Sequence, residues 1–207
     1  YPDEIDEALI DLMASRPNIC KYLDLPLQHA SPRILKAMNR RGDIQRTREL
    51  LKYARDRGFA LRTTVIVGFP GESQEDIDLL TDFMREVRFD RLGAFAFSPE
   101  EGTPAEKMPG QVPEDVKAVR LKAVMELQAA ISLEQNRKRL GSTELLLVTG
   151  RAGGRYTARS QWEAPDSDGI IRLDSGKPLK PGQMVEARIT AAGTYDLEAQ
   201  AAENRGN

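Results

Sequence analysis

Hydrophobic positions recur at helical and at strand spacing in turn over the first two-thirds of the chain. Apolar residues three or four apart predict amphipathic helices, and strict alternation predicts half-buried strands. Helices are expected over 3–15, from 31, over about 45–58, from 73 and over 113–139, and strands over 22–28, 61–67 and 92–98. Each strand is separated from the next by a helix, and crossovers of this length join parallel strands. The pattern therefore predicts a parallel sheet with helices outside, in the α/β class.

Near Gly141 the pattern changes to short strands alone. Five are expected, over 145–148, 156–162, 170–173, 184–189 and 195–199. Gly153-Gly154, Asp168-Gly169 and Pro181-Gly182 supply turns between them. Five short strands in about sixty residues predict a small closed β-barrel, similar in style to an OB-fold. We therefore expect two domains, over 1–139 and 140–207.

The alternation along two strands places polar side chains inside the predicted parallel barrel. Arg62 and Thr64 share one parity, opposite to Leu61, Val65 and Val67, which should face the helices. By the same parity Asp24 and Gln28 point inward from the earlier strand. Inward polar groups near the carboxyl ends of parallel strands are typical of ligand sites. The alternative is a buried salt bridge between Arg62 and Asp24 without a ligand.

The segment Gly68 to Ser73 joins a strand to a helix through two glycines and a proline. Glycine lets the backbone turn tightly and approach a flat ligand closely. Ser73 and Asp76 then form a capping-box-like start to the next helix. A plain connection without a ligand explains the same residues. His29 could be a catalytic base, but a histidine at a strand end is more often a hydrogen-bonded structural group. Arg40-Arg41 is interpreted as a solvated basic pair that ends a short helix.

Charge and cysteine content narrow the function classes. The formal net charge is −2, with 22 basic and 23 acidic side chains over 1–139 and 8 and 9 over 140–207. This balance disfavours a nucleic-acid partner, which favours a basic excess. Cys20 and His29 are the only cysteine and histidine, so the sequence predicts no disulfide, zinc site or self-contained iron–sulfur cluster. The absence of a long apolar run or leader predicts a cytoplasmic protein without a membrane partner.

A mixed-sign, aromatic cluster surrounds one predicted strand of the second domain and its loop. Its members are Arg155, Tyr156, Arg159, Trp162, Asp166 and Asp168. Such a mixture is more typical of a protein-recognition surface than of a phosphate-binding one. Alternatively, Tyr156 and Trp162 belong to the barrel core.

Several strings in order resemble the radical S-adenosylmethionine (SAM) methylthiotransferases. They are Tyr22–His29, Met38–Arg41, Arg62–Glu72 and Ser98–Ala105, and the last sixty or so residues are similar to a TRAM domain. The resemblance covers essentially the whole chain. It implies the carboxy-terminal half of a radical-SAM (β/α) barrel followed by a five-stranded TRAM barrel.

Two subfamilies share these strings, and one methylthiolates an adenosine in tRNA. The other, the RimO type, modifies an aspartate β-carbon of protein twelve of the small ribosomal subunit. The His29 after Gln28, the Val87–Gly93 string and the Ala164–Gly169 loop resemble the RimO type. The near-neutral second domain points the same way. A tRNA substrate is therefore less favoured, and a stand-alone ribosome-binding module without chemistry is a further alternative.

The resemblance also implies cofactors and a site. SAM would contact eight residues: Gln28, Arg62, Thr64, Val65, Ile66, Gly68, Phe69 and Glu72. Two 4Fe-4S clusters, each held by three cysteines, would belong to segments of a longer parent, and this chain would hold no metal and be inactive alone. No catalytic residue is assigned. Tyr156, Arg159, Trp162, Asp166 and Asp168 would contact the ribosomal protein, and the oligomeric state would be a monomer.

Overall fold

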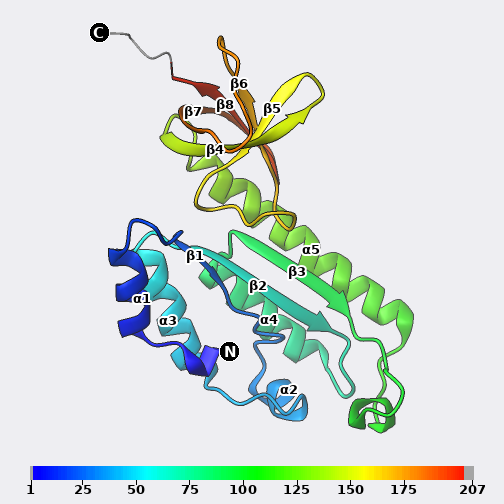
Figure 1. The fold of residues 1–207 in the computed structure, drawn as a ribbon. Coiled ribbons are helices and arrows are strands. Elements are labelled where there is room, and N and C mark those ends of the chain that lie inside the picture. The colour runs from blue at the N-terminus through cyan, green and yellow to red at the C-terminus, as the bar shows by residue number, and fades with distance from the viewer. Residues whose placement is uncertain (1, 203–207) are drawn as a thin grey trace. The chain divides into compact units, whose positions relative to one another are not determined.

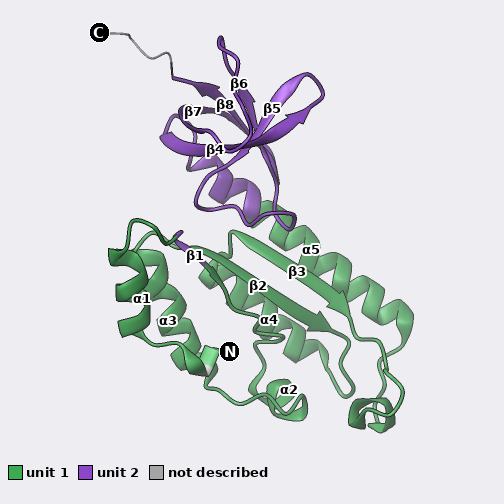
Figure 2. Ribbon diagram, viewed as in Figure 1, with its two compact units in different colours: residues 1–19, 23–131 green, residues 20–22, 132–207 purple. Residues whose placement is uncertain are grey.

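The computed structural model describes residues 2–202, and the chain divides into two compact units (Figure 2). The first unit contains the chain up to Ile19 and the segment Leu23–Ile131. The second contains Cys20–Tyr22 and the chain from Ser132. The long helix that ends the first unit continues into the second.

Helices and strands alternate before Ile131, as the sequence predicts. In chain order the elements are η1 (Pro2–Glu4), α1 (Glu7–Ser15), β1 (Tyr22–Asp24), α2 (Pro32–Ala37), α3 (Ile44–Asp56), β2 (Ala60–Val67), α4 (Gln74–Val87), β3 (Arg91–Ala96), η2 (Pro104–Lys107) and α5 (Glu114–Arg137) (Figure 1). The strands form one sheet in the order β1-β2-β3. Strands β2 and β3 pair in parallel from Arg62 with Arg91 to Val67 with Ala96, which confirms the parallel sheet.

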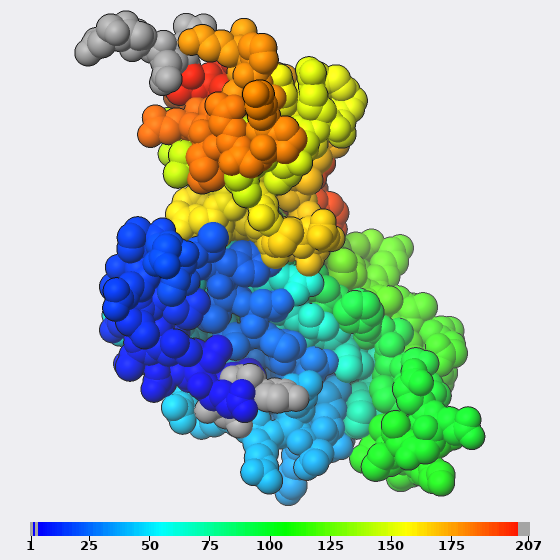
Figure 3. Space-filling model, in the orientation of Figure 1, coloured from blue at the N-terminus to red at the C-terminus, as the bar shows by residue number. Residues whose placement is uncertain are grey.

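The core of the first unit lies on one face of this sheet. Val65 and Val67 from β2 pack there with Leu80 and Met84 from α4 and Val124 from α5. Figure 1 shows α4 and α5 behind the sheet, and Figure 3, in the same orientation, shows strand segments at the surface on the opposite side (blue through green). The sheet of this unit is therefore covered on one face and open on the other.

Several boundaries differ from the sequence prediction, two of them for clear local reasons. The first helix begins at Glu7, because the Asp6 side chain caps it by accepting the N–H of Leu9 at 2.8 Å. Strand β1 is shorter than expected, because Pro26 has no N–H to donate to a ladder. The chain rejoins β2 at Gln28, which forms a parallel bridge with Val65.

The second unit contains a closed five-stranded barrel, as predicted. Its strands are β4 (Thr143–Ala152), β5 (Arg155–Arg159), β6 (Ile171–Asp174), β7 (Met184–Ala192) and β8 (Leu197–Ala201), arranged in the order β4-β5-β6-β8-β7. Leu146, Ile171 and Leu173 are fully buried inside it. The expected strand over 156–162 ends at Arg159, because the N–H of Ser160 donates to the Glu163 carboxylate at 2.9 Å and the chain turns. The last strand begins at Leu197 rather than 195, after a turn closed by Gly193 N–H to the carbonyl of Asp196 at 2.8 Å.

Candidate functional site

Polar side chains of β2 lie on the open face of the sheet. Leu61, Val65 and Val67 are buried in the core, whereas Arg62 and Thr64 are only partly buried. Because side chains alternate along a strand, Arg62 and Thr64 share the face opposite α4 and α5 (Figure 1). This placement confirms the predicted orientation of both groups.

Gln28 lies beside the same stretch of β2. Its N–H donates to the carbonyl of Thr64 at 2.8 Å, and its carbonyl accepts from the N–H of Ile66 at 2.7 Å. Its φ of 72° is left-handed, a conformation that costs a residue with a side chain about 1–2 kcal/mol. The pairing with β2 holds the backbone in this state. Gln28 is thus fixed by tertiary pairing, next to two other predicted site residues.

Arg62 and Asp24 form an ion pair between β2 and β1. Their side chains are 26% and 40% exposed, so the pair considered as the alternative to a ligand exists but is not buried. An exposed pair adds about 0–1 kcal/mol to stability. Its main effect is therefore to hold the guanidinium group on the open face.

Strand β2 ends in a turn at Gly68 that accepts only glycine. The φ of Gly68 is +76°, and a Cβ atom there would lie 2.4 Å from Cγ of Lys117 on α5. Lys117 is held in place, because its Nζ donates to the carbonyl of Phe97 at 2.9 Å and to Glu114 at 2.7 Å. Both the backbone conformation and the available space therefore require glycine.

The Glu72 carboxylate lies in the interior and not on the open face. Its side chain is fully buried, and Oε1 accepts from the N–H of Gly68 at 2.8 Å and from Nη1 of Arg120 at 2.8 Å. Oε2 lies 3.3 Å from Nε2 of His29, which is also fully buried. The structure therefore does not bring this side chain together with Arg62 and Thr64. It closes the Gly68 turn from behind.

His29 is a hydrogen-bonded group of the interior. Its Nδ1 accepts the N–H groups of Ala30 and Ser31 at 3.0 and 2.9 Å. With Nδ1 acting as an acceptor, the proton of the neutral ring sits on Nε2 and faces Glu72. These contacts confirm the structural interpretation of His29.

Asp76 joins the beginnings of two helices. It completes the capping box of α4 with Ser73, as predicted, and also accepts the hydroxyl of Ser31, the cap of α2, at 2.6 Å. Burial alone would raise the pKa of Asp76, but hydrogen bonds from Ser31, Ser73 and Arg33 outweigh it and hold this pKa well below its usual range. This carboxylate thereby connects the loop after Gln28 to the loop after Gly68.

Sequence reasoning overlooked Phe95 on β3. It lies next to Ile66 in the parallel register, shares the open face, and is 60% exposed. The alternation along β3 could have revealed it. Leu92 and Ala94 are two residues apart and face the core, so Phe95, one residue further, faces the opposite side. Nearby, the rings of Phe69 and Phe97 meet edge to face at 5.2 Å. The open face thus combines polar groups with an exposed aromatic ring.

This arrangement fits one of the two cofactors that the resemblance to radical-SAM methylthiotransferases implies. The open face offers the partly buried Gln28, Arg62 and Thr64 as polar partners. Gly68 itself is buried, and its N–H is already bonded to Glu72. The three polar side chains fit SAM. A cluster does not fit, because Cys20 is exposed and residues 2–202 contain no group of three metal-binding side chains.

The five residues predicted to bind a partner lie in the second unit, and both aromatic members make contacts within it. The hydroxyl of Tyr156 accepts the N–H of Leu179 at 3.0 Å and its ring packs against the barrel core. The ring of Trp162 lies 5.2 Å from the guanidinium carbon of Arg139. Tyr156 thus corresponds to the structural alternative, whereas Trp162 is partly buried against Arg139 and is not part of the barrel core cluster.

The acidic members of this set differ from one another. Asp168 accepts the hydroxyl of Tyr22 at 2.7 Å and the N–H of Ala164 at 2.9 Å. Asp166 has a left-handed φ of 63°, and the described structure gives its carboxylate no hydrogen bond or ion pair. The guanidinium group of Arg159 on β5 also forms no hydrogen bond or ion pair within the described residues. Asp166 and Arg159 are therefore the members whose charges are available to a partner.

A buried charge cluster that the sequence analysis did not predict surrounds Arg139. Its guanidinium donates to Glu144 at 2.7 and 3.0 Å, to Glu163 and to Ser160 at 3.1 Å. Burial alone would lower the pKa of Arg139, but its bonds to Glu144 and the charge of Glu163 raise it further above its usual value. The same pairing holds the pKa of Glu163 down against its own burial. Glu144 is only five residues from Arg139, but Ser160 and Glu163 are 21 and 24 residues away, so no local pattern predicts the whole cluster.

Two family models match this sequence. The Radical SAM superfamily matches residues 2–84, and the TRAM domain matches residues 140–202. The ribosomal protein uS12 methylthiotransferase RimO of Desulforudis audaxviator is 46% identical over 202 residues, which is 97% of this chain and 45% of that protein. The chain is a homologue of the RimO methylthiotransferases. RimO of Pelotomaculum thermopropionicum is 48% identical over 205 residues, covering 97% of this chain and 46% of that protein.

This RimO homologue spans about half the length of the curated relatives it matches. Among solved structures, coproporphyrinogen III oxidase (HemN) from Escherichia coli, a radical SAM enzyme, aligns with a TM-score of 0.54 and 14% identity, over 91% of this chain and 44% of that chain. At this identity the likeness shows the fold alone. No helix within residues 2–202 is long and apolar enough to cross a membrane.

Proposed function

We propose that the chain is the carboxy-terminal part of an enzyme that methylthiolates an aspartate β-carbon of the small-subunit ribosomal protein uS12. The observation that carries this proposal is the 46% identity to a RimO over 97% of the chain. The match of a TRAM domain to residues 140–202 supports it. The enzyme would act in the cytoplasm as a monomer.

SAM would bind on the open face of the sheet. Gln28, Arg62 and Thr64 would meet its polar groups, and this is supported by their common placement around β2. Val65, Ile66, Gly68 and Phe69 would frame the adenine, with the buried Val65 and Phe69 acting through their backbone. Glu72 would act indirectly, by holding the Gly68 turn. When bound and reductively cleaved, SAM supplies the radical that removes a hydrogen from the substrate.

The 4Fe-4S clusters would be held by cysteines outside this sequence, because the chain has one cysteine. The 207-residue chain would accordingly be inactive alone. We also place the domain boundary at 139–142, with the barrel half over 1–139 and the TRAM domain over 140–207. The TRAM match that begins at residue 140 supports this boundary.

The second domain would contact uS12 through Tyr156, Arg159, Trp162, Asp166 and Asp168. The balance of 8 basic and 9 acidic side chains over 140–207 supports a protein partner over tRNA. Within the set, the charges of Asp166 and Arg159 are the ones available to a partner's opposite charges.

The test uses the full-length parent, reconstituted anaerobically with iron and sulfide. It is incubated with SAM, a reductant and either uS12 or bulk tRNA, and the products are weighed by mass spectrometry. We expect a methylthio group on a uS12 aspartate and none on tRNA. Modification of a tRNA adenosine would instead assign the enzyme to the tRNA-modifying subfamily. If SAM is not cleaved with either substrate, a binding module without chemistry is favoured.

A further inference from the structure

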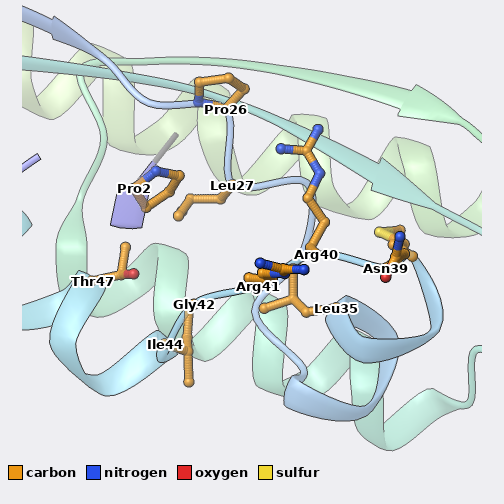
Figure 4. A pocket seen from close by; sticks show the side chains of 11 residues that line it. Pro2, Pro26, Leu27, Leu35, Asn39, Arg40, Arg41, Gly42, Ile44 and Thr47 are labelled. Carbon is orange, nitrogen blue, oxygen red and sulfur yellow. The ribbon is translucent and has the colours of Figure 1, made fainter. Parts of the chain in front are cut away.

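A cavity of about 370 Å³ opens in the first unit beside the candidate SAM site. Its apolar wall includes Pro26, Leu27 and Leu35, and its polar rim includes Arg40 and Arg41. Figure 4 shows Arg40 reaching from its turn toward the Pro26 segment. The cavity adjoins the chain that follows the carboxyl end of β1, and ligands of parallel sheets bind at such ends.

Among the described residues, arginine is the only charged type that lines the cavity. Two arginines and no acidic side chain line it. Arg41 is exposed, and within residues 2–202 its side chain forms no hydrogen bond or ion pair. Arg41 therefore lines a concave surface without an opposite charge bound to it. A solvated arginine on a convex surface would not line a cavity. An anionic group would supply the missing partner.

The surroundings favour a carboxylate over a phosphate. Phosphate sites commonly use free N–H groups at a helix N-terminus. Helix α3 begins at this cavity with Ile44, but the Asp43 carboxylate already occupies its first turn by accepting the N–H of Gln45 at 2.8 Å. The N–H of Gln45 is therefore not available to a phosphate. A planar carboxylate matches the fork of an arginine, and the apolar wall suits the methylene and neighbouring side chains of a peptide.

We propose that this cavity receives an acidic side chain of a protein substrate, with Arg41 binding its carboxylate. The inference rests on the proposed function for the identity of that protein. Arg41 thereby acts as a specificity-determining residue that selects an acidic over an amide side chain close to Gln28.

The first experiment titrates the 207-residue chain by methyl NMR. The probes are a blocked glycine–aspartate–glycine peptide, its asparagine counterpart and inorganic phosphate, with methyl signals of Leu27, Leu35 and Met38 as reporters. We expect the aspartate peptide to shift these signals and the other two to leave them unchanged at the same concentration. Binding of the asparagine peptide with equal affinity, tighter binding of phosphate, or no shift with any probe overturns the proposal.

A matched pair of variants assigns the effect to Arg41. Arg41→Gln should weaken binding of the aspartate peptide about tenfold, the scale of one charge-assisted hydrogen bond. Arg46→Gln removes the same charge from an exposed position of α3 outside the cavity and should leave the affinity unchanged. Equal losses in the two variants would mean that only overall charge matters.

The full-length parent separates this inference from the proposed function. Arg41→Gln should raise KM for uS12 more than it lowers kcat. If the parent modifies uS12 and the variant has the same KM, the cavity assignment is wrong while the function stands. If the parent does not modify uS12, the function fails, and the peptide titration still decides what the cavity binds.

Discussion

Replacing Gly68 with alanine perturbs the turn of the candidate site in two separable ways. The left-handed backbone, with φ of +76°, costs a residue with a Cβ atom about 1–2 kcal/mol. The new Cβ would also lie 2.4 Å from Cγ of Lys117, and overpacking of this kind adds about 1–3 kcal/mol. We therefore expect Gly68→Ala to lower the free energy of unfolding by about 2–5 kcal/mol.

Gly102 provides a matched control in the same unit. Its φ is +80°, and a Cβ there meets nothing within 4 Å. Gly102→Ala should thus show the backbone cost alone. The steric part should shrink in Gly68→Ala combined with Lys117→Ala, so the double variant should lose less than the sum of the two single variants.

The assay is urea unfolding of the 207-residue chain, followed by helix circular dichroism because the helices that pack on the sheet report on this unit. The reasoning is refuted if Gly68→Ala and Gly102→Ala lose the same free energy. It is equally refuted if the effects of Gly68→Ala and Lys117→Ala simply add, because the Cβ would then not meet the lysine side chain.

Three further predictions concern SAM, pH and the partner. In the full-length parent, Arg62→Ala should weaken SAM binding by about 1–3 kcal/mol in a calorimetric titration, whereas an unchanged affinity would leave Arg62 only its ion pair with Asp24. The pKa of Asp76 is lower in the folded than in the unfolded chain, so its ionised carboxylate stabilises the fold fully above the ordinary value of 3.8, and this contribution is lost as the pH falls toward the folded pKa. The urea midpoint should therefore fall less steeply with decreasing pH in Asp76→Asn than in the unchanged chain. Identical slopes would contradict this linkage. Asp166→Asn should slow association of the parent with uS12 in stopped-flow measurements, and tighter, strongly salt-dependent binding of tRNA would argue for the other subfamily.

The sequence alone determined the elements and most of their faces. Period-two alternation separated Arg62 and Thr64 from Val65 and Val67, and the structure places the two groups on opposite faces. The capping residues of α4 were readable because Ser73 and Asp76 are three residues apart. These features depend on residues only a few positions apart, so the local sequence is enough to predict them.

Only the tertiary structure decided which groups meet. The parity of the pattern cannot show that the Glu72 carboxylate turns inward to His29 and Arg120, because those partners come from two other elements. The same holds for Lys117, whose side chain lies on α5 yet requires glycine at position 68. Residues distant in sequence come together only when the sheet and helices pack, so their contacts depend on the whole fold rather than on any segment.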